Sequence, residues 1–327
     1  MKHIVITSIF EPTEAVRRFA ALKEYRLIVA GDLKSPNSWV CEGARFLSAE
    51  EQKRSGFSLA PLLPFNHYCR KLLGYLAAVQ NGATGIVDTD DDNYPYEDWS
   101  FPSFSGDFLT LQDAGYLNIY RRFTDAPIWP RGFPLKEIRG SLAGALGEEV
   151  VRSAEVGIWQ GLADEDPDVD AIYRLTSDVP CQFDKLEPVV LEEGSICPFN
   201  SQNTAFSKRA FPLLYLPSTV TFRFTDILRG LVAQPILWAA GLRLGFTGAS
   251  VKQIRNPHDY MADFRSEVPM FLHGEQAFDI SAELATPTLS VAENLHRVYH
   301  GLLEASIVTS EELPRLEAWL RDLESMS

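Results

Sequence analysis

Hydrophobic and polar positions in the first ninety residues follow two alternating patterns. Short apolar runs rich in β-branched residues predict strands at residues 3–10, 26–32 and 84–87. Apolar residues spaced three and four positions apart predict helices between and before them, at residues 11–25, 48–56 and 66–83. Strands that alternate with helices indicate a parallel sheet with right-handed crossovers. Ligands bind such sheets at the carboxyl ends of the strands.

The middle of the chain has a weaker pattern. Residues 94–217 predict short elements joined by turns rich in Pro, Asp and Asn, which is typical of binding loops. Its landmarks are the segments "WPRGFPL", "DEDPDVDAIYRLT" and "CPFNSQNTAF". These loops are the natural source of further ligand contacts.

The last third regains regular periodicity. Alternation predicts a strand at residues 218–226, followed by a helix at 226–241 with Asp226 at its N-cap. Pro235 is expected to kink or shorten that helix. A strand near 243–248 and a helical tail over 285–327 complete the prediction. The tail carries two capping-box patterns, "SVAE" and "TSEE".

Composition narrows the classes of protein. The chain has 327 residues, 46% of them hydrophobic, and a net charge of −14 from 30 basic and 44 acidic residues. This charge repels nucleic acid and anionic lipid, so nucleic acid is not an expected partner. The four cysteines form no C-x-x-C pair, and no apolar run reaches the length of a membrane span. With a strand in place of a leader at its N-terminus, we expect a soluble, cytoplasmic protein with no membrane span.

The most unusual segment is "GIVDTDDDN", in which Asp88, Asp90, Asp91 and Asp92 follow a predicted buried strand. Three interpretations compete. A calcium loop of the EF-hand type would need a glycine and a distal glutamate that are absent. A solvated acidic turn and a divalent cation shared between carboxylates and a ligand's phosphates both remain open.

A family resemblance narrows this choice. The order of a strand, a helix, a strand ending in Gly-Asp, a long helix and a strand ending in Asp-x-Asp resembles the nucleotide half of a GT-A glycosyltransferase. The segments "FLSAEEQKRSGF", "LLPFNHYCRKLLGYLAAVQNGA", "WPRGFPL", "CPFNSQNTAF" and "FTDILRGLVAQPILWAAG" resemble blocks of the STELLO family of glycosyltransferases, in the same order over roughly residues 3–250. Plant STELLO proteins carry an N-terminal membrane anchor that this sequence does not show. Their partnership with cellulose synthase is therefore not carried over.

The resemblance implies a metal site. In GT-A enzymes an Asp-x-Asp motif holds Mn²⁺ or Mg²⁺ against the donor diphosphate, which makes Asp88 and Asp90 the expected pair. The register Asp90–Asp92 is the alternative, with Asp92 as a ligand. His258 matches the late histidine that many GT-A enzymes use as a third ligand, although a single histidine is more often structural.

The resemblance also implies contacts with the nucleotide sugar. Asp32 and Lys34 follow the second strand, where an acidic residue contacts the nucleoside, and Thr7 and Ser8 end the first strand near the expected base. Phosphate or sugar contacts are expected from residues on the long helix and in the loops, each with an ordinary structural role as its alternative: Arg70, Lys71, Arg131, Asp168, Asp170, Asn200, Gln202 and Asn203.

Catalysis is expected on the helix at 226–241. Inverting GT-A enzymes place a carboxylate at a comparable helix start, so Asp226 is the candidate general base that deprotonates the acceptor. Its alternative role is helix capping. Arg229 and Gln234, further along the helix, are candidate contacts to phosphate and sugar, and we count Arg229 with the catalytic residues.

Together these features predict an α/β, GT-A-type (Rossmann-like), mostly parallel sheet flanked by helices over residues 1–260, and a mostly helical C-terminal extension over 261–327. The expected activity is metal-dependent transfer of a sugar from a nucleotide-diphosphate donor, with UDP the expected nucleotide, to a glycan or other hydroxyl acceptor. Two alternatives remain: a UDP-sugar mutase of the reversibly glycosylated polypeptide type, and a catalytically silent GT-A scaffold. Whether the helical tail forms a homodimer stays open.

Overall fold

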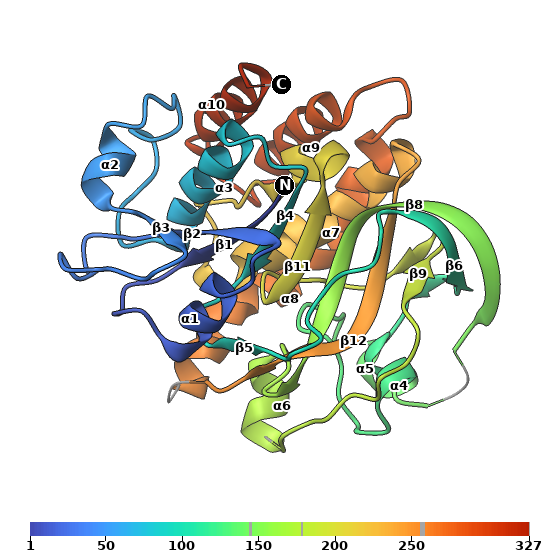
Figure 1. Ribbon diagram of the computed structural model, residues 1–327. Helices are drawn as coiled ribbons and strands as arrows, with labels where there is room; N and C mark the ends of the chain where they lie inside the picture. The colour runs from blue at the N-terminus through green and yellow to red at the C-terminus, as the bar shows by residue number, and fades with distance from the viewer. Residues whose placement is uncertain (144–145, 178, 256–258, 327) are drawn as a thin grey trace.

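A mixed ten-stranded sheet runs through the molecule in the order β3-β2-β1-β4-β11-β8-β6-β9-β12-β5 (Figure 1). The computed structural model describes residues 1–143, 146–177, 179–255 and 259–326. The strands of this sheet are, in chain order, β1 (Lys2–Thr7), β2 (Tyr25–Ala30), β3 (Ala44–Leu47), β4 (Gly85–Thr89), β5 (Asn93–Pro95), β6 (Ser105–Gln112), β8 (Glu148–Glu165), β9 (Val189–Leu191), β11 (Asn203–Ser207) and β12 (Arg243–Gln253). A small second sheet pairs β7 (Gly115–Tyr116) with β10 (Ser195–Ile196).

The N-terminal part of the sheet is parallel, as the alternation of strands and helices predicts. β1 pairs in parallel with β2 and β4, and β2 with β3. β11 then runs antiparallel to β4 and places Thr204 opposite Asp88. The expected α/β class is confirmed, with four parallel strands, β3, β2, β1 and β4, and a mixed remainder. Because parallel strands end at the same edge, the ends of β1, β2 and β4 open onto one region.

Helices cover both faces of the sheet (Figure 1). They are, in chain order, α1 (Glu14–Ala20), α2 (Ala49–Lys53), α3 (Lys71–Gln80), α4 (Tyr120–Phe123), α5 (Ile138–Ser141), α6 (Ala171–Thr176), α7 (Phe222–Ala239), α8 (Tyr260–Leu284), α9 (Val291–Glu304) and α10 (Glu312–Glu324), with 3₁₀ turns at Tyr68–Arg70 and Lys208–Leu214. The capping boxes Ser48–Glu51 and Ser290–Glu293 both form, at the starts of α2 and α9.

The middle segment differs from its prediction. Residues 94–217 contain β6, β9, β11 and the 18-residue strand β8, which lies near the centre of the sheet. Its first residues are mostly exposed and the following ones, Val156–Asp164, are buried without interruption. Such a change of environment within one strand removes the period-2 signal that identifies half-buried strands.

Three predictions near the C-terminal helices are wrong. Residues 218–226 are not a strand, because α7 begins at Phe222 with Thr221 as its N-cap. Asp226 therefore lies in the second turn of α7 and does not cap it. Pro235 lies inside α7, which continues to Ala239. The "TSEE" segment forms no capping box, since α10 has Glu311 at its N-cap position without a side-chain bond.

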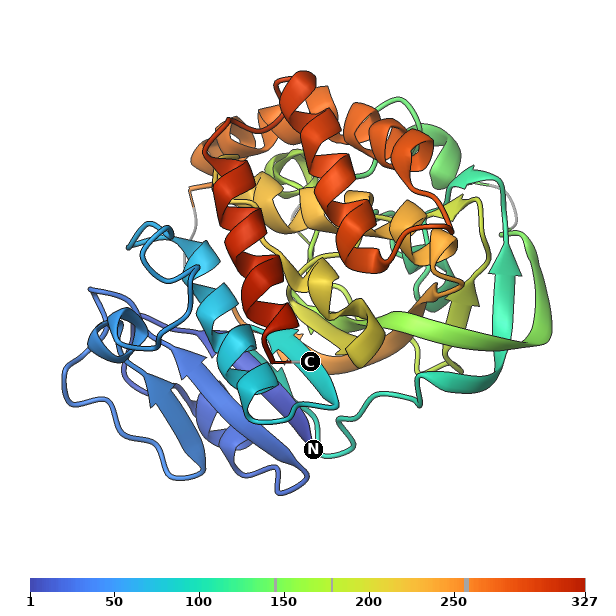
Figure 2. The same cartoon turned by 90° about the horizontal axis from the view of Figure 1, so that it is seen from above.

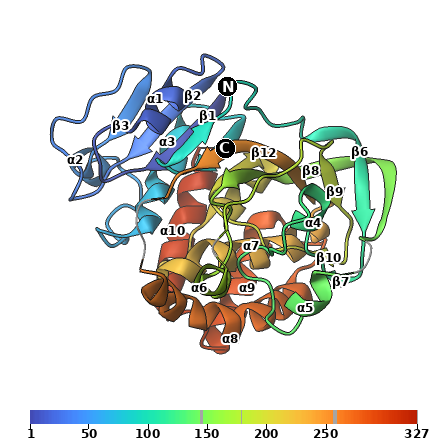
Figure 3. The same ribbon diagram turned by 90° about the horizontal axis from the view of Figure 1, so that it is seen from below.

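The C-terminal helices lie together over one side of the sheet (Figure 2) and α8 forms an outer layer against α7 (Figure 3). Phe278, Tyr299 and Trp319 of these helices belong to the same buried apolar cluster as Leu72 and Ile227. The extension over 261–327 thus shares its core with the sheet, and the boundary at residue 260 remains a prediction. No helix in the described residues combines the length and apolar character needed to cross a membrane.

Candidate active site

A cavity of about 550 Å³ opens at the carboxyl ends of β1, β2 and β4. Residues from both halves of the chain line it, including the start of α7 and the end of β12. The sequence-predicted residues among its lining are Thr7, Ser8, Asp32, Lys34, Arg70, Asp90, Asp92, Arg131, Asp168, Gln202 and Asp226. The predicted site therefore forms largely in one place.

Asp88 is buried beneath this cavity and does not line it. Its carboxylate forms ion pairs with Lys71, at 2.5 Å, and with Arg229, at 2.8 Å. Lys71 also donates to the Thr89 carbonyl at 2.7 Å, and Arg229 donates to the Ser201 hydroxyl at 2.8 Å. Asp88 thus neutralises the charges of Lys71 and Arg229, two side chains that were expected to contact phosphate. Because its carboxylate is occupied by these ion pairs, Asp88 is a poor candidate for a metal ligand.

The next three aspartates face the cavity. Asp90 accepts hydrogen bonds from Lys71 at 3.1 Å and from the Tyr68 hydroxyl at 3.2 Å. The Ser8 hydroxyl donates to Asp91, and the Gln253 amide donates to Asp92 at 3.1 Å.

Burial and mutual repulsion disfavour the charges on these three carboxylates. Desolvation raises the pKa of Asp90 to about 6, and Asp92 and Asp88 add to the shift against the opposing effect of Lys71. Desolvation likewise raises the pKa of Asp91 and of Asp92. A cation between Asp90 and Asp92 would relieve this cost, so the geometry favours the alternative register over Asp88–Asp90. His258 lies outside the described residues.

The strand ends of β1 and β2 form another part of the cavity wall, next to the aspartates. Thr7, Ser8 and the exposed Lys34 line it directly. Asp32 accepts hydrogen bonds from the backbone N–H of Leu33, at 2.7 Å, and of His67, at 3.1 Å. Asp32 thus joins two loops around the cavity, and each of its oxygens keeps a further lone pair for a ligand.

Arg70 lines the cavity, but its guanidinium is hydrogen-bonded to other groups of the protein. Its guanidinium donates to Gln52 at 2.8 Å and to the carbonyls of Ala60 and Leu63, and it stacks over Phe65 at 4.0 Å from the ring centroid. These contacts fix the loop that precedes α3. The alternative structural role anticipated for Arg70 accounts for most of its hydrogen bonds.

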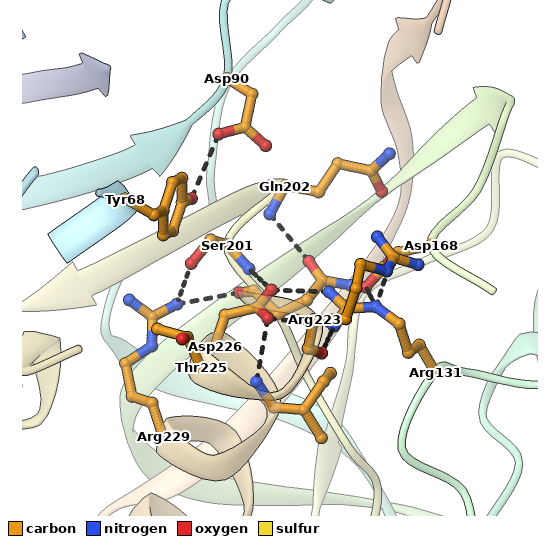
Figure 4. A network of polar contacts seen from close by, with 12 residues as sticks. Tyr68, Asp90, Arg131, Asp168, Ser201, Gln202, Arg223, Thr225, Asp226 and Arg229 are labelled. Carbon is orange, nitrogen blue, oxygen red and sulfur yellow. Dashed lines mark hydrogen bonds and ion pairs between the residues drawn. The ribbon is translucent and has the colours of Figure 1, made fainter. Parts of the chain in front are cut away.

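Arg131 organises the side of the cavity next to α7 (Figure 4). Its Nε donates to Asp168 at 2.8 Å, and Nη1 and Nη2 donate to the two oxygens of Asp226 at 3.1 and 2.8 Å. The loop can approach α7 because Gly132 has φ +91°, and a Cβ there would lie 2.4 Å from the Ile227 side chain. Sequence alone predicted Arg131 as a ligand contact, and the structure shows it bound to two carboxylates.

Asp226 has its acceptor sites filled. Besides the two bonds from Arg131, it accepts one from the Ser201 N–H at 3.2 Å and one from the Ile227 N–H at 3.1 Å. A carboxylate offers about four lone-pair sites. Asp226 must release one of these donors before it can accept a proton from a substrate hydroxyl, a rearrangement that apo geometry does not rule out.

Three arginines, Arg131, Arg223 and Arg255, surround Asp168. Burial would raise the pKa of Asp168, but Arg131, Arg223 and Arg255 together lower it below its usual value. Conversely, burial and the neighbouring Arg223 lower the pKa of Arg255. Arg223 is paired with Glu267 at 2.8 Å, whereas Arg255 lies 3.6 Å from Asp168. This corner of the cavity is therefore suited to an anionic ligand group.

The remaining predicted residues serve the scaffold. Asp170 caps α6 through the Tyr173 N–H at 3.0 Å, and it does not line the cavity. Asn203 bonds to Trp99 and Ser250, and Asn200 accepts from the Gln202 N–H at 2.8 Å.

Gln202 lines the cavity and donates to Gln253 at 2.5 Å. Gln234 is buried, accepts a hydrogen bond from the Cys197 N–H at 3.0 Å and does not line the cavity.

Several lining residues were missed by sequence reasoning: Tyr68, Phe222, Arg223, Gln253 and Arg255. Phe222 and Arg223 were assigned to a strand, which hid their place at the start of α7. Arg255 lies two residues beyond the end of β12, whereas the strand predicted near 243–248 ends too early for the strand-end rule to identify it.

Comparisons with known proteins agree with the resemblance. A family model of STELLO glycosyltransferases matches residues 223–327. "Probable glycosyltransferase STELLO2" and "Probable glycosyltransferase STELLO1" of Arabidopsis thaliana are 28% and 27% identical to this chain, and each alignment covers 98% of it. The chain spans 44% of the length of each of these relatives.

Among solved structures, the crystal structure of a mycobacterial protein matches with a TM-score of 0.43 and 13% identity, over 83% of this chain and 73% of that one. The sequence relatives, aligned over almost the whole chain, and the family model over its C-terminal third make this chain similar to STELLO glycosyltransferases.

Proposed function

We propose that this protein transfers a sugar from a nucleotide-diphosphate donor, a UDP-sugar in the first instance, to an acceptor hydroxyl with the help of a divalent cation. The observation that carries the proposal is a single cavity that joins strained carboxylates, Asp90 and Asp92, to the arginine-rich corner at Arg223 and Arg255. A metal-bound diphosphate carries a cation, which the carboxylates attract, and anionic oxygens, which the arginines attract.

The residues present fit a cation that is shared with a ligand. Within the described part of the chain, no three His, Cys, Asp or Glu side chains are grouped as a complete metal site. Mg²⁺ and Mn²⁺ bound to a nucleotide need only one or two protein carboxylates, which Asp90 and Asp92 supply. When bound, the cation offsets the negative charge that develops on the leaving diphosphate.

The protein's own groups divide the remaining work. Thr7, Ser8 and Lys34 border the space for the nucleoside, and Arg223 and Arg255 border the space for anionic oxygens. Lys71 and Tyr68 hold Asp90 in place from below. Because these contacts exist before any ligand arrives, little reorganisation is needed on binding.

In the transfer step, the acceptor oxygen bonds to the anomeric carbon of the sugar. The bond from that carbon to the β-phosphate oxygen breaks, and its electron pair leaves with the nucleoside diphosphate. The acceptor proton passes to Asp226, which exchanges one of its present hydrogen bonds for it. This single displacement inverts the anomeric configuration.

Calorimetric titration of UDP tests the proposal directly. We expect binding with Mn²⁺ that is lost in EDTA, and a loss of at least about 100-fold in Asp90→Ala. Asp107→Asn removes an exposed carboxylate from β6 and serves as the charge-matched control. Equal UDP binding in EDTA and in Asp90→Ala would refute the shared-cation site. A panel of nucleotide sugars, assayed by UDP release, then identifies the donor.

A further inference from the structure

Phe222, the first residue of α7, is a large apolar side chain that lines the cavity while 59% of its surface is exposed. Fully burying a Phe side chain is worth about 1.5–3 kcal/mol, and this ring forgoes much of that gain. A single exposed apolar residue needs no explanation on an ordinary surface. Phe222 differs because it borders the proposed reaction centre.

Phe222 lies between Asp226, the proposed general base, and Tyr68, which contacts the proposed metal ligand Asp90. It lies four residues before Asp226, so the two side chains share one face of α7, about 5–6 Å apart at Cβ. On its other side it makes an edge-to-face contact with Tyr68, with centroids 5.6 Å apart at 81°. The Tyr68 hydroxyl donates to Asp90 at 3.2 Å. Tyr68 limits the freedom of the Phe222 ring and links it to the metal side of the cavity.

A sugar ring has the chemistry that such a surface binds. It carries an apolar face of C–H groups and a polar edge of hydroxyls. A phenyl ring covers the apolar face without hydrogen bonds of its own, and gives large contact area for few lost rotamers. Arg223 and Asp226 lie beside Phe222 and can meet the hydroxyl edge.

We propose that Phe222 is the platform on which the acceptor stacks, and that the acceptor is therefore a carbohydrate. This inference rests on the proposed glycosyltransferase function. The nucleoside space was assigned to the part of the cavity lined by Thr7 and Lys34, whereas the exposed Phe222 can receive a ligand that arrives from solvent. Stacking there brings a hydroxyl of the acceptor ring next to Asp226.

The test separates acceptor from donor effects. With a donor found in the UDP-release panel, release is measured with water alone and then with monosaccharides and disaccharides at millimolar concentrations. We expect carbohydrate to accelerate UDP release by the wild-type protein. In Phe222→Ala the acceptor KM should rise about five- to tenfold, with a smaller change in kcat and less than a twofold change in the Kd for UDP.

Conservative and distant variants complete the design. Phe222→Trp and Phe222→Tyr keep an aromatic face and should restore the acceptor KM. If the role of Phe222 were merely structural, an aromatic ring of different size would not restore it. Leu272→Ala removes a side chain on α8 that is 69% exposed and should leave all constants unchanged.

Three results would overturn the inference while leaving the proposed function intact: UDP release that no carbohydrate accelerates, an unchanged acceptor KM in Phe222→Ala, or no rescue by Trp and Tyr. An absence of metal-dependent UDP binding and of any donor turnover would instead refute the proposed function, and the inference with it.

Discussion

The two sides of the cavity hold their carboxylates in opposite ways. On the β4 side, burial and repulsion raise the pKa of Asp90 to about 6, and Lys71, its cation partner, is shared with Asp88. On the α7 side, Asp168 has a lowered pKa because Arg131 and two further arginines surround it. The β4 side has fewer cations than carboxylates, whereas each carboxylate named on the α7 side has an arginine partner.

This difference shows where a ligand can add stability. Ion pairs that are already complete, such as Arg131 with Asp226, gain little from a new charge and are costly to break. Carboxylates held close without enough cations gain most when a cation arrives. We infer that the β4 side is kept strained for binding and that the paired groups of the α7 side keep it rigid.

The largest effect is expected where a pair is broken inside the protein. Asp88→Asn leaves Lys71 and Arg229 as buried cations without their shared carboxylate, so the free energy of unfolding should fall by about 3–5 kcal/mol. Urea unfolding at pH 7 measures this. A loss below about 1 kcal/mol would show that the two cations do not depend on Asp88.

A somewhat smaller loss is expected on the α7 side. Arg131→Met keeps the bulk of the side chain but strands Asp168 and Asp226, which should cost about 3 kcal/mol. Arg255→Met is the matched comparison and should cost less than about 1 kcal/mol, because burial and the neighbouring Arg223 already disfavour the charge of Arg255 and lower its pKa. Equal losses in the two variants would remove the contrast between Arg131, with its two close carboxylates, and Arg255, with one at 3.6 Å.

The smallest expected effect is an increase in the free energy of unfolding. Asp90→Asn should stabilise the metal-free protein in EDTA at pH 7 by about 1 kcal/mol, because the folded state disfavours the Asp90 charge. The folded wild type binds this proton more tightly than the unfolded chain, so its own stability rises as the pH falls through about 6.

The advantage of Asp90→Asn should therefore be greatest above pH 6 and vanish below about pH 4, where Asp90 is protonated in both states. Thermal unfolding across this pH range measures the trend. An Asn variant that is less stable than the wild type at pH 7 would show that Asp90 is not strained.

Local patterns located well the side of the cavity formed by the strand ends. Thr7, Asp32 and Asp90 follow strands whose apolar runs are continuous, and parallel strands must end together. By contrast, alternation over Val220 to Phe224 suggested a strand although Thr221 starts a helix. Short apolar alternations do not separate a strand from a helix start, because both are only a few residues long.

Pairing partners could not be read from the chain. Asp88 and Arg229 are 141 residues apart, and Arg131 and Asp226 are 95 apart. Each residue type is equally suited to a ligand or to a partner inside the protein. Only their positions assign Asp88 to the scaffold and leave Asp90 facing the cavity.

The sequence by itself determined the α/β class, the aspartates at the end of β4 and the resemblance to the STELLO family, since all three depend on local order along the chain. The tertiary structure decided which charges are neutralised within the protein and which remain for a ligand. That division depends on distances of a few ångströms between residues far apart in sequence, because Coulomb energy and desolvation change steeply over such distances.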